Sequence, residues 1–281
     1  MKIESVYGDF LPCAGRFRCP ACHEGMALRK PASLVCRAGH CYDLSRLGYA
    51  NFLPHQKPTK YTEQQFASRR AVFERGCYEP LAEAICRLVR ESRHGGRPAR
   101  MLDVGCGEGY YTRALCAGLE DAELYAFDNA KEAVAMAAKA CRGVRWFVAD
   151  LTNVPLRSGA VNVLLSLFAP SNYAEFSRLL GEGGRVIKVV PGEGYLRELR
   201  ALIWEGQGGY SPEPVADHLS RHMVLEKRIP LRYERTVDRE LAGHFLRMTP
   251  MMFGKAPSSV DIGQLTRMTF AFELFLMRSQ T

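Results

Sequence analysis

The stretch Met101–Thr112 reads MLDVGCGEGYYT, and it decides the fold of this 281-residue chain. It predicts a buried strand, then a turn whose glycines are spaced G-x-G-x-G at Gly105, Gly107 and Gly109, then the start of a helix. Glycines permit positive φ angles and let a ligand approach the backbone closely. A dinucleotide-binding loop would instead read G-x-G-x-x-G and hold a pyrophosphate at the helix start, where Glu108 would repel it. We therefore expect a nucleoside ligand that carries no phosphate.

Short apolar runs alternate with amphipathic stretches on both sides of this turn. The expected strands are Arg100–Val104, Leu124–Phe127, Val144–Ala149, Val161–Leu167 and Arg185–Val190. The expected helices between them are Tyr110–Leu119, Lys131–Cys141 and Tyr173–Leu180. Such alternation predicts parallel β-α-β units in a doubly wound α/β sheet of the Rossmann-like type. Apolar residues that alternate from Met268 to Leu276 predict a last strand that closes the sheet.

Three aspartates lie at the ends of successive expected strands, namely Asp103, Asp128 and Asp150. A carboxylate in the position of Asp128 can accept hydrogen bonds from ribose hydroxyls, and Asp150 could accept one from an adenine amino group. A single aspartate at a strand end is often only a helix cap. Three of them around one glycine loop favour S-adenosylmethionine (SAM), whose sulfonium and ammonium groups tolerate acidic neighbours such as Asp103 and Glu108.

Four of the ten cysteines fall within the first forty residues, and their spacing indicates a metal site. Cys19-Pro-Ala-Cys22 is followed after thirteen residues by Cys36-Arg-Ala-Gly-His40. The first pair of thiolates can face one ion, and Cys36 with His40 completes a tetrahedron around zinc. A redox Cys-x-x-Cys would belong to a β-α-β unit, which this part of the sequence does not predict. One structural zinc ion per chain is expected, and Cys41 is treated as a spare residue.

Composition suggests where the domains divide. Residues 1–54 form the expected zinc-binding module, residues 55–68 a polar linker, and residues 69–281 the catalytic domain. Apolar residues at helical spacing predict a helix over Phe66–Arg90. Residues 205–257, rich in Gly, Pro and Met, interrupt the alternation of strands and helices and are expected to be a substrate-specific insertion.

The net charge of +8 is concentrated in the amino-terminal part of the chain. Residues 1–100 carry 17 Lys and Arg against 9 Asp and Glu, whereas the remaining residues carry 21 of each kind. This distribution favours contact of the first part with a polyanion, and the zinc module is expected to recognise RNA, although a modest excess also occurs on ordinary surfaces. The chain starts without an apolar leader and contains no uncharged apolar run of about 20 residues, so we expect a soluble, cytoplasmic protein with no membrane contact.

The combination of these motifs resembles the bacterial 23S ribosomal RNA (guanine-N1-)-methyltransferases along nearly the whole chain. Besides the zinc ligands and the glycine loop, the resemblance rests on HCYDLSRLGYANFLP (His40–Pro54), SRRAVFERGCYEPL (Ser68–Leu81), SLFAPSNYAEF (Ser166–Phe176), KVVPGEGYLRELR (Lys188–Arg200) and MTP (Met248–Pro250). It implies a class I SAM-dependent methyltransferase domain preceded by a zinc-ribbon-like module. It also implies a homodimer that methylates N1 of a guanine in a 23S rRNA hairpin.

Carried over by position, the resemblance assigns zinc to Cys19, Cys22, Cys36 and His40, and cofactor contacts to Tyr78, Gly107, Glu108 and Tyr195. Some relatives have His in the position of Tyr195, so this residue departs from their pattern. The cofactor candidates are therefore Tyr78, Asp103, Gly105, Gly107, Glu108, Gly109, Asp128, Asp150 and Tyr195.

Candidate substrate residues fall into two groups. Phe168 and Tyr173 could stack on the target base and Asn172 could contact its edge, but both aromatic rings are equally compatible with a place in the core. Four basic residues could contact RNA phosphates or form an ordinary solvated face: Lys57, Lys60, Arg69 and Arg70. The general base that removes the N1 proton is not identified by the sequence.

Two other classes of function stay open. A SAM-dependent methyltransferase of another RNA or of a small molecule would share the glycine loop, but a small-molecule enzyme would not need a basic zinc module. A zinc-dependent RNA-binding protein with a non-catalytic methyltransferase fold would keep the module and usually lose the glycine loop. In this chain both features are intact.

Overall fold

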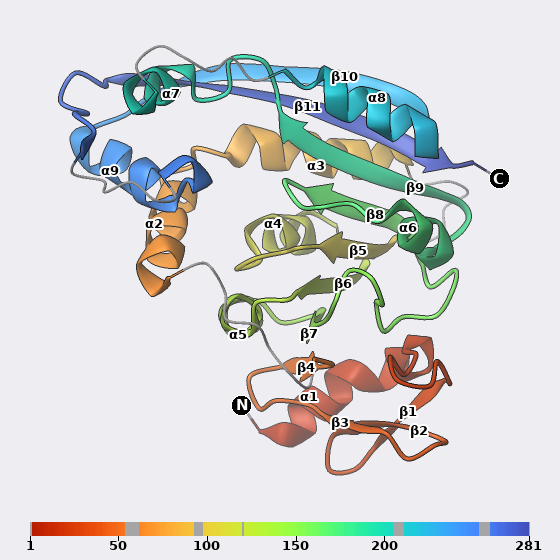
Figure 1. Cartoon of the computed structure of the whole chain (residues 1–281). Coiled ribbons are helices and arrows are strands. Elements are labelled where there is room, and N and C mark those ends of the chain that lie inside the picture. The colour runs from red at the N-terminus through yellow and green to blue at the C-terminus, as the bar shows by residue number, and fades with distance from the viewer. Residues whose placement is uncertain are drawn as a thin grey trace.

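The computed structural model describes residues 2–53, 62–92, 98–119, 121–204, 211–252 and 259–280. Within them, eight strands form one twisted sheet in the order β10-β11-β9-β8-β5-β6-β7-β4, and three short strands form a second sheet (Figure 1). The strands of the main sheet are β4 (Tyr49–Asn51), β5 (Arg100–Val104), β6 (Glu123–Asp128), β7 (Val144–Val148), β8 (Val161–Leu167), β9 (Leu180–Pro191), β10 (Met223–Thr236) and β11 (Arg267–Ser279).

The central strands β4, β7, β6, β5, β8 and β9 pair in parallel, whereas β11 and β10 are antiparallel to their neighbours. The strand order reverses between β5 and β8, so the turn after β5 opens at a topological switch point. In α/β sheets of this kind, ligands bind in the crevice at the carboxyl ends of the strands near such a point. The fold therefore places the glycine loop where a ligand is expected.

Side chains alternate between the two faces of the sheet and contribute to two separate cores. One core joins Met101, Leu124 and Val163 to the helices of one face. These helices are α2 (Glu63–Glu74), α3 (Glu79–Ser92), α4 (Tyr110–Gly118), α5 (Lys131–Ala140), α7 (Arg197–Ile203) and α9 (Arg239–Met248). The other core joins Leu102 and Leu164 to α6 (Tyr173–Leu179), α8 (Glu213–His222) and the amino-terminal residues.

The amino-terminal module packs directly against this second face (Figure 1). It consists of α1 (Ile3–Phe10), the 3-10 turn η1 (Leu11–Arg16), β1 (Met26–Arg29), β2 (Ser33–Cys36) and β3 (Cys41–Asp43). The fully buried ring of Phe17 lies 5.9 Å from that of Phe147 on β7 and 6.0 Å from that of Tyr125 on β6. The module and the sheet therefore share one hydrophobic core, because so small a unit buries too little apolar surface by itself.

Most expected elements are present, and three expectations need correction. The expected helix Phe66–Arg90 is two helices, α2 (Glu63–Glu74) and α3, separated by a turn in which Gly76 has φ +69°. Because α2 starts at Glu63 behind a Thr62–Gln65 capping box, residues 63–68 of the expected linker are helical. Residues 205–257 do not simply interrupt the sheet, because they contain its edge strand β10, which pairs with β11.

The helices within the described residues are all too short or too polar to span a membrane.

Candidate functional site

The four expected zinc ligands come together at the edge of the small sheet. Cys36 Sγ lies 3.3 Å from His40 Nδ1, Cys19 Sγ lies 3.6 Å from the same nitrogen, and Cys22 Sγ lies 3.6 Å from Cys36 Sγ. All four ligand atoms lie within 4.8 Å of one another. Ligand atoms of a tetrahedral zinc site with bonds of about 2.0–2.3 Å are separated by similar distances. Three thiols and one imidazole are therefore arranged as the ligands of a structural zinc site would be, whereas exposed Cys41 turns towards Asp43.

All three glycines of the glycine loop have left-handed backbone conformations, and two of them are also closely packed against neighbouring side chains. Gly105, Gly107 and Gly109 have φ angles of +70°, +56° and +77°. A Cβ at Gly105 would lie 2.8 Å from Ala169 Cβ, and one at Gly109 would lie 2.6 Å from the Trp146 ring. At Gly107, the only described atom within 4 Å of such a Cβ is Arg69 Nη2, at 3.6 Å. The loop is thus fixed by packing at both ends, whereas at its centre Arg69 is the only described residue outside the loop that comes this close.

Two of the expected carboxylates hold this loop in place. Thr112 Oγ1 donates a 2.5 Å hydrogen bond to Asp103, and burial raises the pKa of that carboxyl to about 6. Asp128 accepts hydrogen bonds from the backbone nitrogens of Gly107 at 3.0 Å and Ala130 at 2.9 Å. The end of β6 is therefore tied to the centre of the loop that follows β5, and a contact between Asp128 and a ribose stays a prediction.

Asp150, the third expected carboxylate, is exposed and begins a turn after β7. Its Oδ1 accepts hydrogen bonds from the backbone nitrogen and the hydroxyl of Thr152, each at 2.8 Å. These contacts are those of a turn-forming aspartate. A contact between Asp150 and adenine stays a prediction.

Glu108 is buried, with 3% of its side chain exposed, and pairs with a residue far away in the sequence. Its Oε1 accepts a 3.2 Å hydrogen bond from Nε of Arg69 on α2, whose guanidinium also lies 5.7 Å from the centre of the Phe73 ring. Arg69, which the sequence made a candidate for contact with RNA phosphates, thus lies against the glycine loop.

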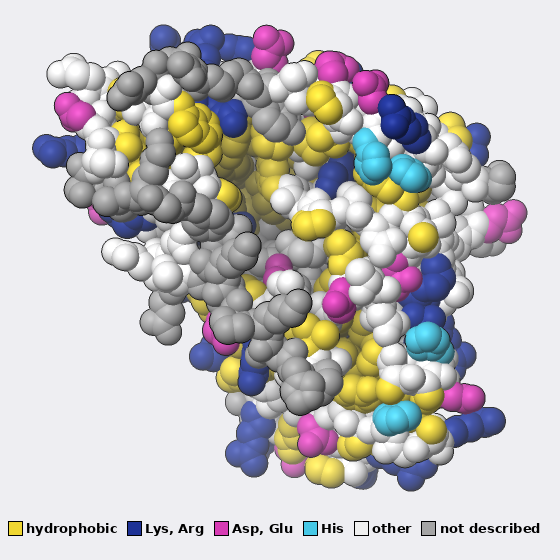
Figure 2. Space-filling model, viewed as in Figure 1, with side chains coloured by type: hydrophobic (Ala, Val, Ile, Leu, Met, Phe, Trp, Pro, Cys, Tyr) yellow, Lys and Arg dark blue, Asp and Glu magenta, His cyan; other side chains and the backbone are white. Residues whose placement is uncertain are grey.

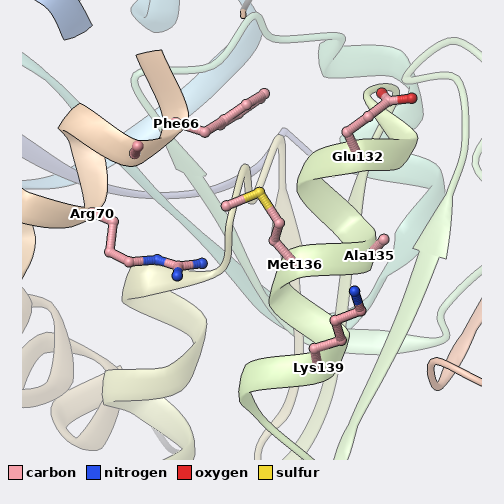
Figure 3. A pocket seen from close by; sticks show the side chains of 7 residues that line it. Phe66, Arg70, Glu132, Ala135, Met136 and Lys139 are labelled. Atoms are coloured by element: carbon pink, nitrogen blue, oxygen red, sulfur yellow. The ribbon is translucent and has the colours of Figure 1, made fainter. Parts of the chain in front are cut away.

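Arg70, the next residue, is exposed and lines a pocket of about 340 Å³ between α2 and α5. Figure 3 shows Arg70 and Phe66 from α2 facing Met136 and Lys139 from α5. Contact of Arg70 with RNA remains a prediction. Lys57 and Lys60 lie outside the described residues.

Two tyrosines that are 117 residues apart form part of an aromatic wall beside the loop. The hydroxyl oxygens of Tyr78, after α2, and Tyr195, after β9, are 2.5 Å apart. Burial raises the pKa of both hydroxyls, that of Tyr195 to about 12, so both are neutral at physiological pH. The Phe272 ring on β11 lies 5.9 Å from Tyr78 and 5.3 Å from Tyr195. Figure 2 shows a hollow lined by hydrophobic side chains between the α2 and α9 helices and the main sheet.

The three substrate candidates Phe168, Asn172 and Tyr173, which follow β8, have different surroundings in the structure. Phe168 has φ +56°, is 41% exposed, and lies 5.7 Å from the ring of Phe272 in the aromatic wall. Asn172 caps α6 by accepting a 3.1 Å hydrogen bond from the backbone nitrogen of Glu175. Tyr173 stacks on His222 of α8 at 4.9 Å and therefore faces away from that wall. Among the three, Phe168 has the position best suited to contact a base.

One buried side chain beneath this loop was missed by the sequence analysis. Lys188 on β9 is 5% exposed and donates hydrogen bonds to Ser166 Oγ, at 3.0 Å, and to the carbonyl oxygen of Ala169. Burial lowers its pKa to about 8, and no carboxylate of the described residues pairs with it. A lysine inside the apolar strand segment VIKVV was the available signal, because lysine is almost never fully buried unless it is paired.

The sheet, the glycine loop and the cysteine–histidine cluster define a class I SAM-dependent methyltransferase with an amino-terminal zinc ribbon. Family models agree with this class: "Methyltransferase domain" matches residues 101–189, and "RlmA, N-terminal", a zinc ribbon, matches residues 17–60.

Relatives narrow the assignment to one family. The chain is 37% identical to "Putative 23S rRNA (guanine-N(1)-)-methyltransferase YxjB" of Bacillus subtilis, over 88% of this chain and 90% of that protein. It is 32% identical to "23S rRNA (guanine(748)-N(1))-methyltransferase" of Streptomyces fradiae, over 86% and 88% of the two chains. A malonyl-[acyl-carrier protein] O-methyltransferase of Methylococcus capsulatus is 33% identical but matches only 48% of this chain. The chain belongs to the 23S rRNA (guanine-N1-)-methyltransferase family.

Proposed function

We propose that this protein transfers a methyl group from SAM to N1 of a guanine in a hairpin of 23S rRNA. The observation that carries the proposal is similarity over 86–88% of the chain to proteins named for this activity, together with the match of residues 17–60 to the zinc-ribbon model. The match to an enzyme that methylates an acyl-carrier substrate covers about half of the chain, which argues against the small-molecule alternative.

The residues suggest how the reaction is organised. Bound SAM supplies an electrophilic methyl group on a sulfonium sulfur, and alignment of the guanine nitrogen with that methyl group supplies much of the rate. We expect Asp128 to hold the ribose while its contact with Gly107 keeps the loop in shape. Exposed Phe168, on the loop that touches Gly105 through Ala169, is expected to stack on the guanine ring. The N1 proton must leave as the N–C bond forms, and its acceptor is not assigned.

The direct test uses purified enzyme, SAM with a labelled methyl group, and 23S rRNA from cells that lack this gene. Digestion to nucleosides should place the label in N1-methylguanosine, and mass mapping should locate the modified guanine. The Asp128→Ala variant serves as a control, since loss of ribose hydrogen bonds worth roughly 1–3 kcal/mol should lower the yield at limiting SAM. Label on cytosine, on another guanine atom or only in small metabolites would overturn the proposal.

Two wider expectations follow from this substrate. An enzyme acting on ribosomal RNA belongs in the cytoplasm, where we expect this protein. The family resemblance also predicts a homodimer, which light scattering on the purified protein will test.

A further inference from the structure

Two cysteines outside the zinc cluster lie side by side, although strand β6 separates them in the sequence. Cys116 is near the carboxyl end of α4, and Cys141 directly follows α5. The thiols of both lie close to one acceptor, the carbonyl oxygen of Arg142, which is 3.7 Å from Cys116 Sγ and 3.3 Å from Cys141 Sγ. Among the cysteines of the described residues, no other pair outside the zinc ligands shares an acceptor. The fold therefore brings these two thiols together.

The two thiols also interact with each other. Burial first, and then the neighbouring Cys116 thiol, through its charge and a hydrogen bond, raises the pKa of Cys141 to about 11. The guanidinium of Arg113 acts in the opposite direction without offsetting these effects. Cys141 therefore stays protonated at neutral pH, and Cys116 is the thiol of the pair that is suited to react first.

Both thiols are within reach of a small reagent. Cys116 and Cys141 are partly exposed, and both belong to the surface end of their helices. Cys41 and Cys106 are also not fully buried, but neither shares a hydrogen bond with a second thiol in the part of the chain that the structure describes. Exposure together with an adjacent second thiol is the combination that favours reversible oxidation of cysteine.

We propose that Cys116 and Cys141 form a site of reversible oxidation, at which a peroxide joins α4 to α5 through a disulfide bond. The sulfur of Cys116 attacks one oxygen of hydrogen peroxide, the O–O bond breaks, and water leaves, which gives a sulfenic acid. The sulfur of Cys141 then attacks the sulfur of Cys116, the S–O bond breaks, and the proton of Cys141 completes a second water molecule. Two thiols and one peroxide thus give one disulfide and two water molecules, and a thiol such as glutathione reverses the reaction.

The disulfide would lie away from the glycine loop. Helix α4 begins directly after Gly109, so roughly two helical turns separate Cys116 from the loop. In a β-α-β unit the helix runs back against the direction of the strands, so its carboxyl end lies at the edge of the sheet opposite to the ligand crevice. We therefore expect oxidation to leave cofactor affinity unchanged. We also expect it to stabilise the fold, because a bond that closes a loop of about 25 residues restricts the unfolded chain.

Peptide mapping of the full-length, zinc-loaded protein tests the inference. The protein is treated with hydrogen peroxide, its remaining thiols are alkylated, and it is digested with trypsin, which separates the two cysteines because Lys131 and Lys139 lie between them. A linked peptide that contains Cys116 and Cys141 should appear, with a mass lower than the sum of its parts by the two hydrogen atoms lost. Dithiothreitol should remove it. Zinc content, measured on the same sample, shows that the metal site has stayed intact.

Stability and ligand binding provide two further measurements. Oxidation should raise Tm by roughly 4–10 °C and leave the affinity for S-adenosylhomocysteine within about twofold. Cys116→Ser and Cys141→Ser should each abolish both the linked peptide and the rise in Tm. Cys41→Ser, which removes an exposed cysteine that has no thiol partner among the described residues, is the matched control and should behave like the unaltered protein.

Three results would overturn the inference. The first is oxidation of Cys116 or Cys141 without a linked peptide, which would show that the two thiols do not meet. The second is a disulfide from either cysteine to a different partner. The third is a Cys116–Cys141 disulfide that lowers Tm, because the bond would then form only by distortion of the fold.

Discussion

Gly107 offers a way to separate cofactor binding from folding, because its neighbours in the loop are confined and it is not. In Gly107→Ala the new methyl group meets only Arg69 Nη2, at 3.6 Å, among the described atoms. The remaining cost is that of alanine at φ +56°, roughly 1–2 kcal/mol of unfolding free energy. For a protein of this size that corresponds to a fall in Tm of roughly 2–8 °C. The methyl group would nevertheless occupy the space expected for the cofactor, so affinity for S-adenosylhomocysteine should fall at least about tenfold.

Gly109→Ala is the matched comparison in the same loop. Its Cβ would lie 2.6 Å from the Trp146 ring and 2.9 Å from Ala137 Cβ, at φ +77°. Overpacking and left-handed strain together should lower the unfolding free energy by about 2–5 kcal/mol. For both variants, calorimetry measures the affinity for S-adenosylhomocysteine, and thermal unfolding measures the loss of stability. Unchanged cofactor affinity in Gly107→Ala, or a larger loss of stability there than in Gly109→Ala, would refute the assignment of the open space to the cofactor.

Three further predictions concern other parts of the molecule. Cys36→Ser should reduce the zinc content from about one ion per chain and destabilise the amino-terminal module, as elemental analysis will show; full metal content in this variant would contradict the ligand set. Because burial raises the pKa of Asp103 to about 6, the folded state binds this proton more tightly than the unfolded chain, and stability is lost as pH rises from 3.8 to about 6. Asp103→Asn removes this titrating group. The unfolding free energy of the variant minus that of the unaltered protein, measured with urea, should therefore increase between pH 4 and pH 7. A difference that stays constant over this range would contradict the prediction. Lys188→Met removes an unpaired buried charge together with its hydrogen bonds to Ser166 and Ala169, so Tm should change little. Loss of support for the loop should lower kcat for RNA about tenfold or more, with cofactor affinity retained, and an unchanged kcat would exclude this role.

The amino-acid sequence determined those features whose signal is contained within a few neighbouring residues. Strands β5 and β8 have the predicted bounds, because a buried parallel strand is an uninterrupted apolar run. The spacing of Cys19, Cys22, Cys36 and His40 predicted that these side chains gather like the ligands of one zinc ion, and the structure brings them together. The glycine loop was identified in the same way, because positive φ and close packing both require glycine.

The tertiary structure decided what depends on residues far apart in the chain. Strand β10 contains six Lys, Arg or Glu residues and one proline, a composition that does not predict a strand, so this edge strand is recognised only from its pairing with β11. The position of Phe17 against Phe147, and of Tyr78 against Tyr195, follows from how the chain crosses the sheet. The same holds for the Arg69–Glu108 pair, whose partners are 39 residues apart. Local propensity acts over about one turn of helix or a few residues of strand, so contacts across the sheet are set only when the whole topology has formed.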